Sequence, residues 1–283
     1  MDTVAAPTEN RTRTTLKTAD KALMLLNFFS PETPEFRLSD LARAAQMDKV
    51  TTMRMLASLG SAGFVEQHPE TRKYRLGTAV LRLARIREAS FPVISVVQPI
   101  LDALTEVTGE TTHAGLIAGT SITTIAVAEP HRATRVFVDP VQPLPLHATA
   151  SGLAYLAHLP EDRLCETLKR LDTKPFTPLT LQSETDLRAK LDTVRANGCA
   201  VSSRTFEAEV TGIAAPIFDW HGAVQGTLSA ACIASRLTDD LQNQIEHHVL
   251  RAAVKATRAM GGDPPSRLLA LIETRETNRK AQS

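Results

Sequence analysis

The first quarter of the chain contains three amphipathic helix patterns in close succession, and this feature constrains the fold more than any other. In residues 15–29, apolar side chains recur at spacings of three and four, which predicts a helix that ends at Ser30-Pro31. Ser39 is expected to cap a short second helix that ends at Ala45. Asp48 is expected to cap a third helix over residues 49–61. The apolar stripe of this third helix comprises Val50, Met53, Leu56, Ala57 and Leu59.

Two short strand patterns follow the third helix. Gly63 is expected to end that helix, and residues 64–67 and 73–76 have the composition of short strands. The turn-rich segment of residues 68–72 joins them as a hairpin. The order is therefore helix, helix, helix, hairpin.

The third helix carries side chains that can donate hydrogen bonds to phosphates or base edges, on the face opposite its apolar stripe. These side chains are Lys49, Thr51, Thr52, Arg54 and Ser58. The hairpin adds Arg72, Lys73 and Arg75, and the preceding arm adds Arg11 and Arg13. Two interpretations stay open at this point: a DNA-recognition surface, or a small helical domain with a solvated basic face.

Charge is unevenly distributed along the chain, although the formal net charge is only +1. Residues 1–90 contain 14 Lys or Arg against 10 Asp or Glu, whereas residues 91–283 contain 18 against 21. A basic first part joined to an acidic remainder suggests two domains, of which the first faces an anion. Residues 1–14 are polar and lack a hydrophobic period, so we expect them to form a flexible arm.

A second, larger domain is predicted after a helical linker. Helical periods in residues 78–89 and 93–108 are interrupted at Pro92, and we assign residues 78–92 to the linker. Residues 93–262 combine strand and helix patterns, which predicts an α+β domain with hairpins in its sheet. The expected strands are residues 113–118, 121–128, 135–138, 199–205, 213–218 and 224–234. The expected further helices are residues 151–158, 161–171, 183–197 and 238–260, and the tail of residues 263–283 has the pattern of one more.

Composition limits the class of protein. With 43% hydrophobic and 22% charged residues, the chain has the balance of an ordinary water-soluble globular protein. Cys165, Cys199 and Cys232 lie far apart, which predicts neither a CxxC metal site nor a disulfide scaffold. No apolar run approaches the roughly 18 residues needed to cross a bilayer, and the first thirty residues lack a signal-peptide pattern. We therefore expect a cytoplasmic protein without a membrane partner.

Several motifs occur in a fixed order along residues 15–262. The first part contains TADKAL from Thr18, LSDLA from Leu38, KVTTMRMLASL from Lys49, GFV from Gly63 and YRLG from Tyr74. The later part contains LHATASGLAYLA from Leu146, GIAAPIFD from Gly212, GTLS from Gly226 and SRLT from Ser235. In order and spacing these motifs resemble the IclR-type bacterial transcription regulators, with the first set resembling the winged helix-turn-helix domain of that family.

The resemblance implies a winged helix-turn-helix head in residues 15–77, a helical linker used in dimerisation, and a GAF-like effector domain in residues 93–262. In that domain a mixed or antiparallel sheet flanked by helices would bind a small, often carboxylate-bearing metabolite. The family acts as homodimers or dimers of dimers. A two-fold dimer would place two recognition helices in successive major grooves, so the double-stranded DNA operator should be near-palindromic. Effector binding would then change the spacing or stability of the heads.

The resemblance also implies where the effector binds. The pocket loop of the family falls on Thr149, Ala150 and Ser151, where backbone N–H groups and the helix dipole can receive a carboxylate. The alternative is an ordinary helix N-terminus capped by Thr149 or Ser151. His147 beside this loop could donate to a ligand or make a structural hydrogen bond to the backbone. His113, at the beginning of an inner strand, is a further candidate for the cavity lining.

The opposite wall of the implied pocket departs from the family pattern. An acidic pair is frequent there, whereas this chain has Ser202-Ser203-Arg204-Thr205. Gly212 stands where the family frequently has a Cys. The family often has a Ser-x-Ser pair on a strand; here the first serine is kept as Ser229, and Ala231 replaces the second. Because Arg can hold a carboxylate with two hydrogen bonds, Arg204 would favour a more negative or bulkier effector. The alternative places Arg204 on the surface. The expected effector-binding residues are His147, Thr149, Ala150, Ser151, Ser202, Arg204, Gly212 and Ser229.

Enzyme signatures are absent from the sequence. It contains no nucleophile elbow, phosphate-binding loop, zinc-protease motif or dinucleotide fingerprint. His247 and His248 would face different directions on a helix, so we predict no metal site and no cofactor. Ser151 with His147 keeps a hydrolase-like enzyme open as one alternative, and a ligand-independent DNA-binding protein is the other. The leading prediction is a non-enzymatic regulator that senses a small organic acid.

Overall fold

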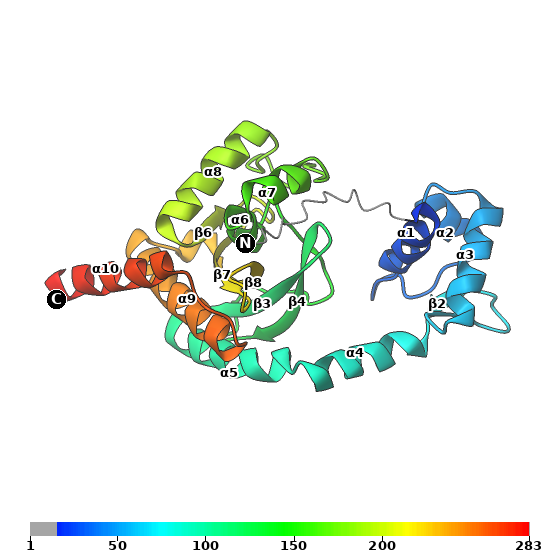
Figure 1. Cartoon of the computed structure of the whole chain (residues 1–283), viewed down its shortest axis with the longest axis horizontal. Helices are drawn as coiled ribbons and strands as arrows, with labels where there is room; N and C mark the ends of the chain where they lie inside the picture. The colour runs from blue at the N-terminus through cyan, green and yellow to red at the C-terminus, as the bar shows by residue number, and fades with distance from the viewer. Residues whose placement is uncertain (1–15, 283) are drawn as a thin grey trace, which may run out of the picture. The chain divides into compact units, whose positions relative to one another are not determined.

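The computed structural model describes residues 16–282, which divide after Ser90 into two compact units (Figure 1). The expected flexible arm, residues 1–14 with Arg11 and Arg13, lies outside the described residues. The division after Ser90 falls within the proposed linker, residues 78–92.

The first unit has the predicted order of three helices and a hairpin. α1 (Lys17–Met24) continues as the 3-10 helix η1 (Leu25–Phe28), and α2 (Leu38–Ala44), α3 (Lys49–Ser61), β1 (Val65–Gln67) and β2 (Tyr74–Leu76) follow. The Asp48 carboxylate accepts the N–H of Thr51 at 2.8 Å and caps α3 as predicted. The prediction that Ser39 caps α2 is wrong, because the helix begins at Leu38 and Ser39 lies inside its first turn.

The predicted apolar stripe of α3 is partly wrong. Val50 and Met53 are 63% and 47% exposed, whereas Thr52 and Met55 are buried. Apolar residues lie on both faces of this helix, so the sequence pattern alone does not fix which face turns inward. The core of the unit consists of Leu25, Phe29, Leu41, Met55, Leu56, Leu59 and Val65.

α4 (Thr78–Ser90) ends the first unit and leaves its apolar side chains largely uncovered. Of its described residues only Ala79 is buried. Leu81, Leu83 and Ile86 are all exposed. The helix therefore contributes little to the core of its own unit.

The second unit is built on one six-stranded antiparallel sheet. Its strand order is β5-β4-β3-β8-β7-β6. The bounds are β3 (Thr111–Ala118), β4 (Ser121–Ala128), β5 (Leu144–Pro145), β6 (Ala200–Ser203), β7 (Val210–Phe218) and β8 (Val224–Ile233). The strand expected over residues 135–138 is wrong, because this segment is irregular and β5 pairs with β4 instead. The Thr111 hydroxyl donates to the carbonyl of Val136 at 2.6 Å and holds the irregular segment against the end of β3.

Helices cover both faces of this sheet (Figure 1). α5 (Val93–Thr108) and α9 (Asp239–Ala259) pack on one face, and α6 (Ala150–Ala157), α7 (Glu161–Leu168) and α8 (Glu184–Asn197) lie over the other. The side chains of Thr149, Ser183 and Thr238 cap α6, α8 and α9, in agreement with the capping residues read from the sequence. The predicted α+β class is confirmed.

The tail forms the helix α10 (Ser266–Gln282), which packs on α9. Leu268 is buried in the same core as α9. Arg275 pairs with the largely buried carboxylate of Glu246 at 3.0 Å. The helix read from the pattern of the tail is therefore present, and it is held to the second unit through α9.

Among residues 16–282, no single helix is both long and apolar enough to cross a bilayer. Within this part of the chain, only α4 and α5 together, as a bent pair, have enough length and apolar composition. In α5, however, Val97, Leu101 and Leu104 are buried in the core of the second unit.

Candidate functional site

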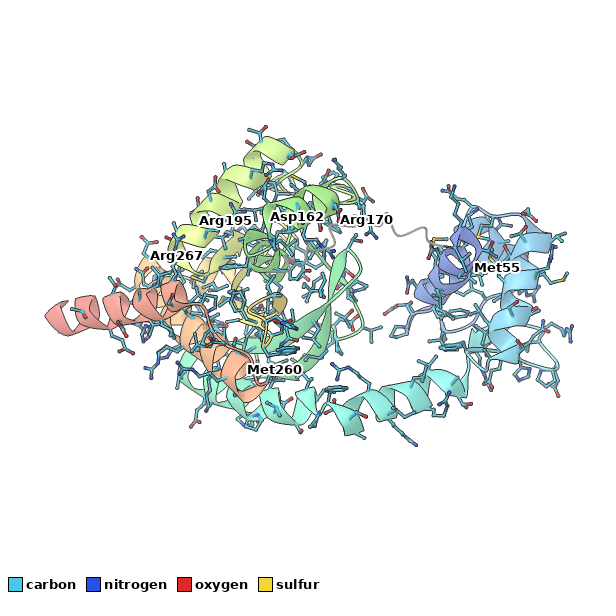
Figure 2. The ribbon with its side chains drawn as sticks, in the orientation of Figure 1. Met55, Asp162, Arg170, Arg195, Met260 and Arg267 are labelled. Carbon is cyan, nitrogen blue, oxygen red and sulfur yellow. The ribbon has the colours of Figure 1, made fainter. Side chains whose placement is uncertain are left out.

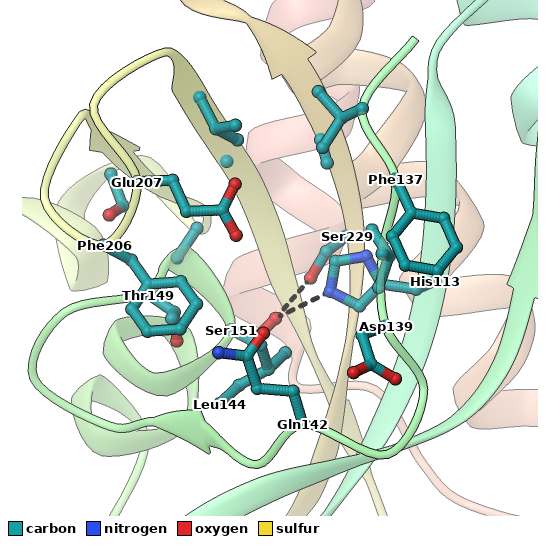
Figure 3. Close-up of a pocket in the computed structure, with 17 residues that line it drawn as sticks. His113, Phe137, Asp139, Gln142, Leu144, Thr149, Ser151, Phe206, Glu207 and Ser229 are labelled. Carbon is teal, nitrogen blue, oxygen red and sulfur yellow. Dashed lines mark hydrogen bonds between the residues drawn. The ribbon is translucent and has the colours of Figure 1, made fainter. Parts of the chain in front are cut away.

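The second unit encloses a small cavity of about 80 Å³ between the sheet and the start of α6 (Figure 3). This volume suits roughly six waters, or a small organic molecule. The sheet contributes His113, Gly212, Ser229 and Ala231, and the start of α6 contributes Thr149, Ala150 and Ser151. The remaining lining comes from two mainly irregular stretches, within residues 136–144 and 202–210, which include ends of β5, β6 and β7.

The first turn of α6 presents backbone donors at the edge of this cavity. The Thr149 hydroxyl accepts the N–H of Gly152 at 3.0 Å and donates to the carbonyl of Pro145 at 2.8 Å. The N–H groups of Ala150 and Ser151 lie in the first turn of α6, where backbone N–H groups find no carbonyl acceptor within the helix. Thr149 is therefore the cap that the sequence indicated, and the same turn lines the cavity.

Small residues allow α6 to approach the sheet here. A Cβ added at Gly212 would lie 3.2 Å from the Cβ of Ala150, tighter than most such contacts. Gly212 and Ala231 are paired across β7 and β8, so this row of the sheet presents little side-chain volume beneath the helix. The Gly and Ala noted in the sequence thus leave the space that forms the cavity.

A chain of polar side chains forms the floor of the cavity (Figure 3). The hydroxyls of Ser151 and Ser229 lie 2.7 Å apart, and the Ser151 hydroxyl lies 3.4 Å from Nε2 of His113. His113 and Ser229 are direct partners across β3 and β8. Nδ1 of His113 is buried without a hydrogen-bond partner among the described residues. Burial lowers the pKa of His113 to about 4, so the ring is neutral at pH 7.

The low pKa of His113 predicts a loss of stability on acidification. The unfolded chain binds a proton near pH 6.5 and the folded chain near pH 4, so protonation favours unfolding as the pH falls between these values. We expect His113 to contribute a loss of about 2 kcal/mol in unfolding free energy between pH 7 and pH 5. Urea unfolding of the parent and of His113→Asn at both pH values measures it. An equal pH dependence in the two proteins would contradict the prediction.

The hydrolase-like alternative gains little from this geometry. His147, the base considered for it, bonds through Nε2 to the carbonyl of Lys174 at 3.0 Å. His113 is the histidine near Ser151, but an imidazole with a pKa of about 4 is a weak base at pH 7. No described group orients its Nδ1, as the third member of a catalytic triad would.

Two of the expected effector-binding residues lie outside the cavity lining. His147 is buried against Phe176 and makes the structural hydrogen bond that was its alternative interpretation. Arg204 adopts a left-handed backbone conformation (φ 58°) at the end of β6, and its side chain is exposed. The predicted pocket roles of His147 and Arg204 are therefore corrected, because the turn after β6 directs Arg204 away from the cavity. The other six, Thr149, Ala150, Ser151, Ser202, Gly212 and Ser229, all line it.

Ser202 has a positioning contact as well as a place in the lining. Its hydroxyl donates to the carbonyl of Ala148 at 3.0 Å, and the Thr205 hydroxyl donates to the same carbonyl at 2.6 Å. Ala148 immediately precedes the capped turn of α6. These contacts tie the end of β6 to the segment that positions the donors of α6.

The sequence reasoning missed the residues that close the cavity. They are Val136, Phe137, Val138, Asp139, Gln142 and Leu144 from one stretch, and Phe206, Glu207 and Val210 from the other. The strands expected over residues 135–138 and 199–205 gave no guide to these side chains, because the chain is irregular over residues 135–143 and 204–209. The available signal was compositional: a Phe beside an acidic residue in the turn between β6 and β7.

The expected DNA-facing side chains of α3 are mostly accessible. Lys49, Arg54 and Ser58 are exposed and Thr51 is half-buried. Thr52 is fully buried, and its hydroxyl donates to the carbonyl of Asp48 at 2.9 Å. Its predicted groove contact is therefore wrong, because the helix turns this face toward the core.

The hairpin presents a smaller basic surface than its composition implied. Arg72 is exposed at the tip, with a left-handed backbone conformation (φ 56°). Lys73 lies 3.7 Å from Glu35, and Arg75 bonds to Glu66 at 2.7 Å. Arg72 is thus the hairpin cation best placed to reach a phosphate, while the other two are partly neutralised within the unit.

Known protein families match both units of the chain. Residues 88–258 match the family model described as bacterial transcriptional regulator IclR C-terminal, and residues 18–69 match the IclR helix-turn-helix domain.

Individual relatives and solved structures extend over most of the chain. It is similar to the HTH-type transcriptional regulator XynR of Escherichia coli, with 28% identity over 87% of this chain and 98% of that protein. A putative IclR transcriptional regulator from Silicibacter sp. TM1040 is 40% identical, with a TM-score of 0.81 over 88% of this chain and 98% of that one. An IclR homologue from Microbacterium hydrocarbonoxydans, complexed with 4-hydroxybenzoate, is 23% identical, with a TM-score of 0.67 over 86% and 98%.

Proposed function

This chain belongs to the IclR family of bacterial transcriptional regulators, and from that premise we propose that a small organic acid in the cavity beneath α6 changes its affinity for operator DNA. Family membership makes the protein a DNA-binding regulator with a helix-turn-helix head. The nature of the ligand and the residues that bind it are our own proposal.

The observation that carries the ligand proposal is the set of hydrogen-bond donors around one end of the cavity. The first turn of α6 offers N–H groups and the positive end of a helix dipole, which favour a carboxylate. The hydroxyls of Ser151 and Ser229 and the neutral ring of His113 complete a polar floor. The Microbacterium relative bound to 4-hydroxybenzoate, itself a carboxylate, is consistent with this class of ligand.

We place the DNA contacts on the exposed face of α3 and on the hairpin. Lys49, Thr51, Arg54 and Ser58 would enter the major groove, and Arg72 with Lys73 would contact the backbone. Because an Arg side chain can read a guanine with two hydrogen bonds, Arg54 is the strongest candidate for base recognition.

A second copy of the chain is the proposed partner of α4. The exposed Leu81, Leu83 and Ile86 give this helix an apolar face, and such faces mark protein contacts. A homodimer, alone or paired into a dimer of dimers, would present two heads to a near-palindromic operator. The effector would favour one arrangement of the heads. The free-energy shift between the two arrangements cannot exceed the difference in the effector's binding free energy for them.

Replacing Arg54 by Ala is expected to weaken operator binding by about 1 to 3 kcal/mol, because a base contact would be lost. The side chain is exposed, so the fold should be unaffected. The measurement is a gel-shift titration on a duplex that the parent protein selects from a randomised pool. Arg170→Ala, the same change at an exposed residue beside α7, is the control (Figure 2). Equal affinity in the parent and Arg54→Ala would remove Arg54 from the interface.

The same titration tests the effector when small carboxylic acids are added. A ligand present at about 100 times its Kd should also stabilise the second unit by roughly 2.7 kcal/mol, which a thermal-shift panel detects. Recovery of the unchanged acid by mass spectrometry separates sensing from hydrolysis. Operator affinity that no acid changes would contradict the proposal and favour a ligand-independent regulator.

A further inference from the structure

The charged side chains that line the cavity are acidic. Asp139 and Glu207 both face it, and among its lining residues there is neither Lys nor Arg. With Arg204 turned outward and His113 neutral, no side-chain cation there offsets a second negative group on a ligand. A ligand that carried only negative charge would therefore meet attraction at α6 and repulsion at these carboxylates.

Neither carboxylate is neutralised by a cation among the described residues. One oxygen of Asp139 accepts the N–H of Val141 at 2.9 Å, and neither Asp139 nor Glu207 is in an ion pair there. Arg135 lines an adjoining outer hollow, but Glu129 holds it at 2.7 Å. Partial burial raises the pKa of the Glu207 carboxyl, as expected for an acid without a compensating charge.

Asp139 and Glu207 reach the cavity from opposite sides (Figure 3). Figure 3 shows Ser151, Ser229 and His113 clustered together, while Glu207 extends from the turn between β6 and β7 toward the open middle of the cavity. The ring of Phe206 lies beside Glu207, and that of Phe137 lies on the opposite wall. An edge-to-face contact with Phe176, 4.9 Å between ring centroids, orients Phe206. Aromatic faces beside carboxylates are the surroundings that organic ammonium groups favour.

We propose that the effector is a small zwitterion, whose carboxylate binds at the start of α6 and whose ammonium group lies between Glu207, Asp139 and the rings of Phe137 and Phe206. This inference rests on the proposed function, since it assigns the second half of the same ligand. The cavity volume of about 80 Å³ favours a compact effector, such as a small amino acid or betaine.

The test uses pairs of acids that differ in charge but hardly in shape. Glycine betaine and 3,3-dimethylbutanoate carry a trimethylammonium and a tert-butyl group in the same position. 4-Aminobutanoate and pentanoate form a second pair, and succinate supplies a second carboxylate instead of the ammonium. Calorimetry on the full chain is expected to show at least about tenfold tighter binding for the ammonium member of one pair. Succinate should bind more weakly than that member.

Variants of the two carboxylates identify the source of this preference. Glu207→Gln should reduce the preference to about threefold or less, because it removes charge while keeping size. Asp139→Asn retains an oxygen that can accept the N–H of Val141 and should act in the same direction. The control is Glu166→Gln, the same change at an exposed side chain of α7 that lines neither the cavity nor the adjoining hollow. It should leave the preference unchanged.

Each outcome separates this inference from the proposed function. If 3,3-dimethylbutanoate and pentanoate bind as tightly as their ammonium partners, the zwitterion is wrong, while a carboxylate effector stands. The same holds if the preference survives in both Glu207→Gln and Asp139→Asn. If no acid in the panel binds or alters operator affinity, the proposed carboxylate effector fails as well.

Discussion

Gly152→Ala is expected to destabilise the second unit by at least about 3 kcal/mol, because one added methyl group would collide with backbone atoms that cannot move aside. A Cβ at this position in α6 would lie 2.2 Å from Cα and 2.3 Å from the carbonyl oxygen of Leu146. The segment from Leu146 to Thr149 crosses over the first turn of α6 and supplies its cap. Relieving the collision must displace that segment, so carboxylate binding should be lost together with stability.

Gly60→Ala is the matched control, since it is the same substitution in another helix. A Cβ at Gly60 in α3 would meet only the carbonyl oxygen of Val65, at an ordinary 3.6 Å. Alanine favours the helix over glycine, so this change should stabilise the first unit by up to about 1 kcal/mol. Trp220, the single tryptophan of the chain, is 72% exposed, so urea unfolding of both units is followed by far-UV circular dichroism instead of fluorescence. An unchanged urea midpoint for Gly152→Ala by circular dichroism would contradict the collision.

Local chemistry explains which parts of the fold the sequence predicts well. A cap is decided by a side chain and an N–H group three residues away, so Asp48, Ser183 and Thr238 could each be identified from neighbouring residues. Strands and helices with a clear period were placed within a few residues for the same reason. Ser39 shows the limit, because a residue suited to capping lies inside a helix when the preceding residue already begins the turn.

The candidate site depends on contacts between distant segments, which periodicity does not encode. Thr52 and Met53 exchange their expected environments because tertiary packing selects one of two apolar faces on α3. Arg204 leaves the cavity because the chain turns with a positive φ at that residue. Asp139 and Glu207 enter the cavity from irregular stretches, where no repeating pattern indicates direction. The small residues and α6 donors were found because the family resemblance supplied their positions.

Arg236→Met is expected to lower the free energy of unfolding of the second unit by about 3 to 5 kcal/mol, because it leaves a buried carboxylate without its main partner. The Glu110 side chain is 2% exposed, and both of its oxygens bond to Nη2 of Arg236, at 2.7 and 2.6 Å. The other cation near it, Arg132, is 3.7 Å away and more exposed. Methionine keeps the apolar stem of arginine, so the main loss is that of the charge and its hydrogen bonds.

The same variant should weaken ligand binding, because Arg236 helps to hold one wall of the cavity. Its Nη1 donates to the carbonyl of Thr134 at 3.4 Å, just before the stretch that contributes Phe137 and Asp139. Adding Glu110→Gln to Arg236→Met should restore much of the stability, since a neutral amide is less costly to bury than a carboxylate. Arg43→Met, which removes an exposed pair with Asp40 at 3.7 Å, should cost under about 1 kcal/mol. If Arg236→Met costs as little as Arg43→Met in urea unfolding, the Glu110 pair is screened by solvent and does not fix the cavity wall.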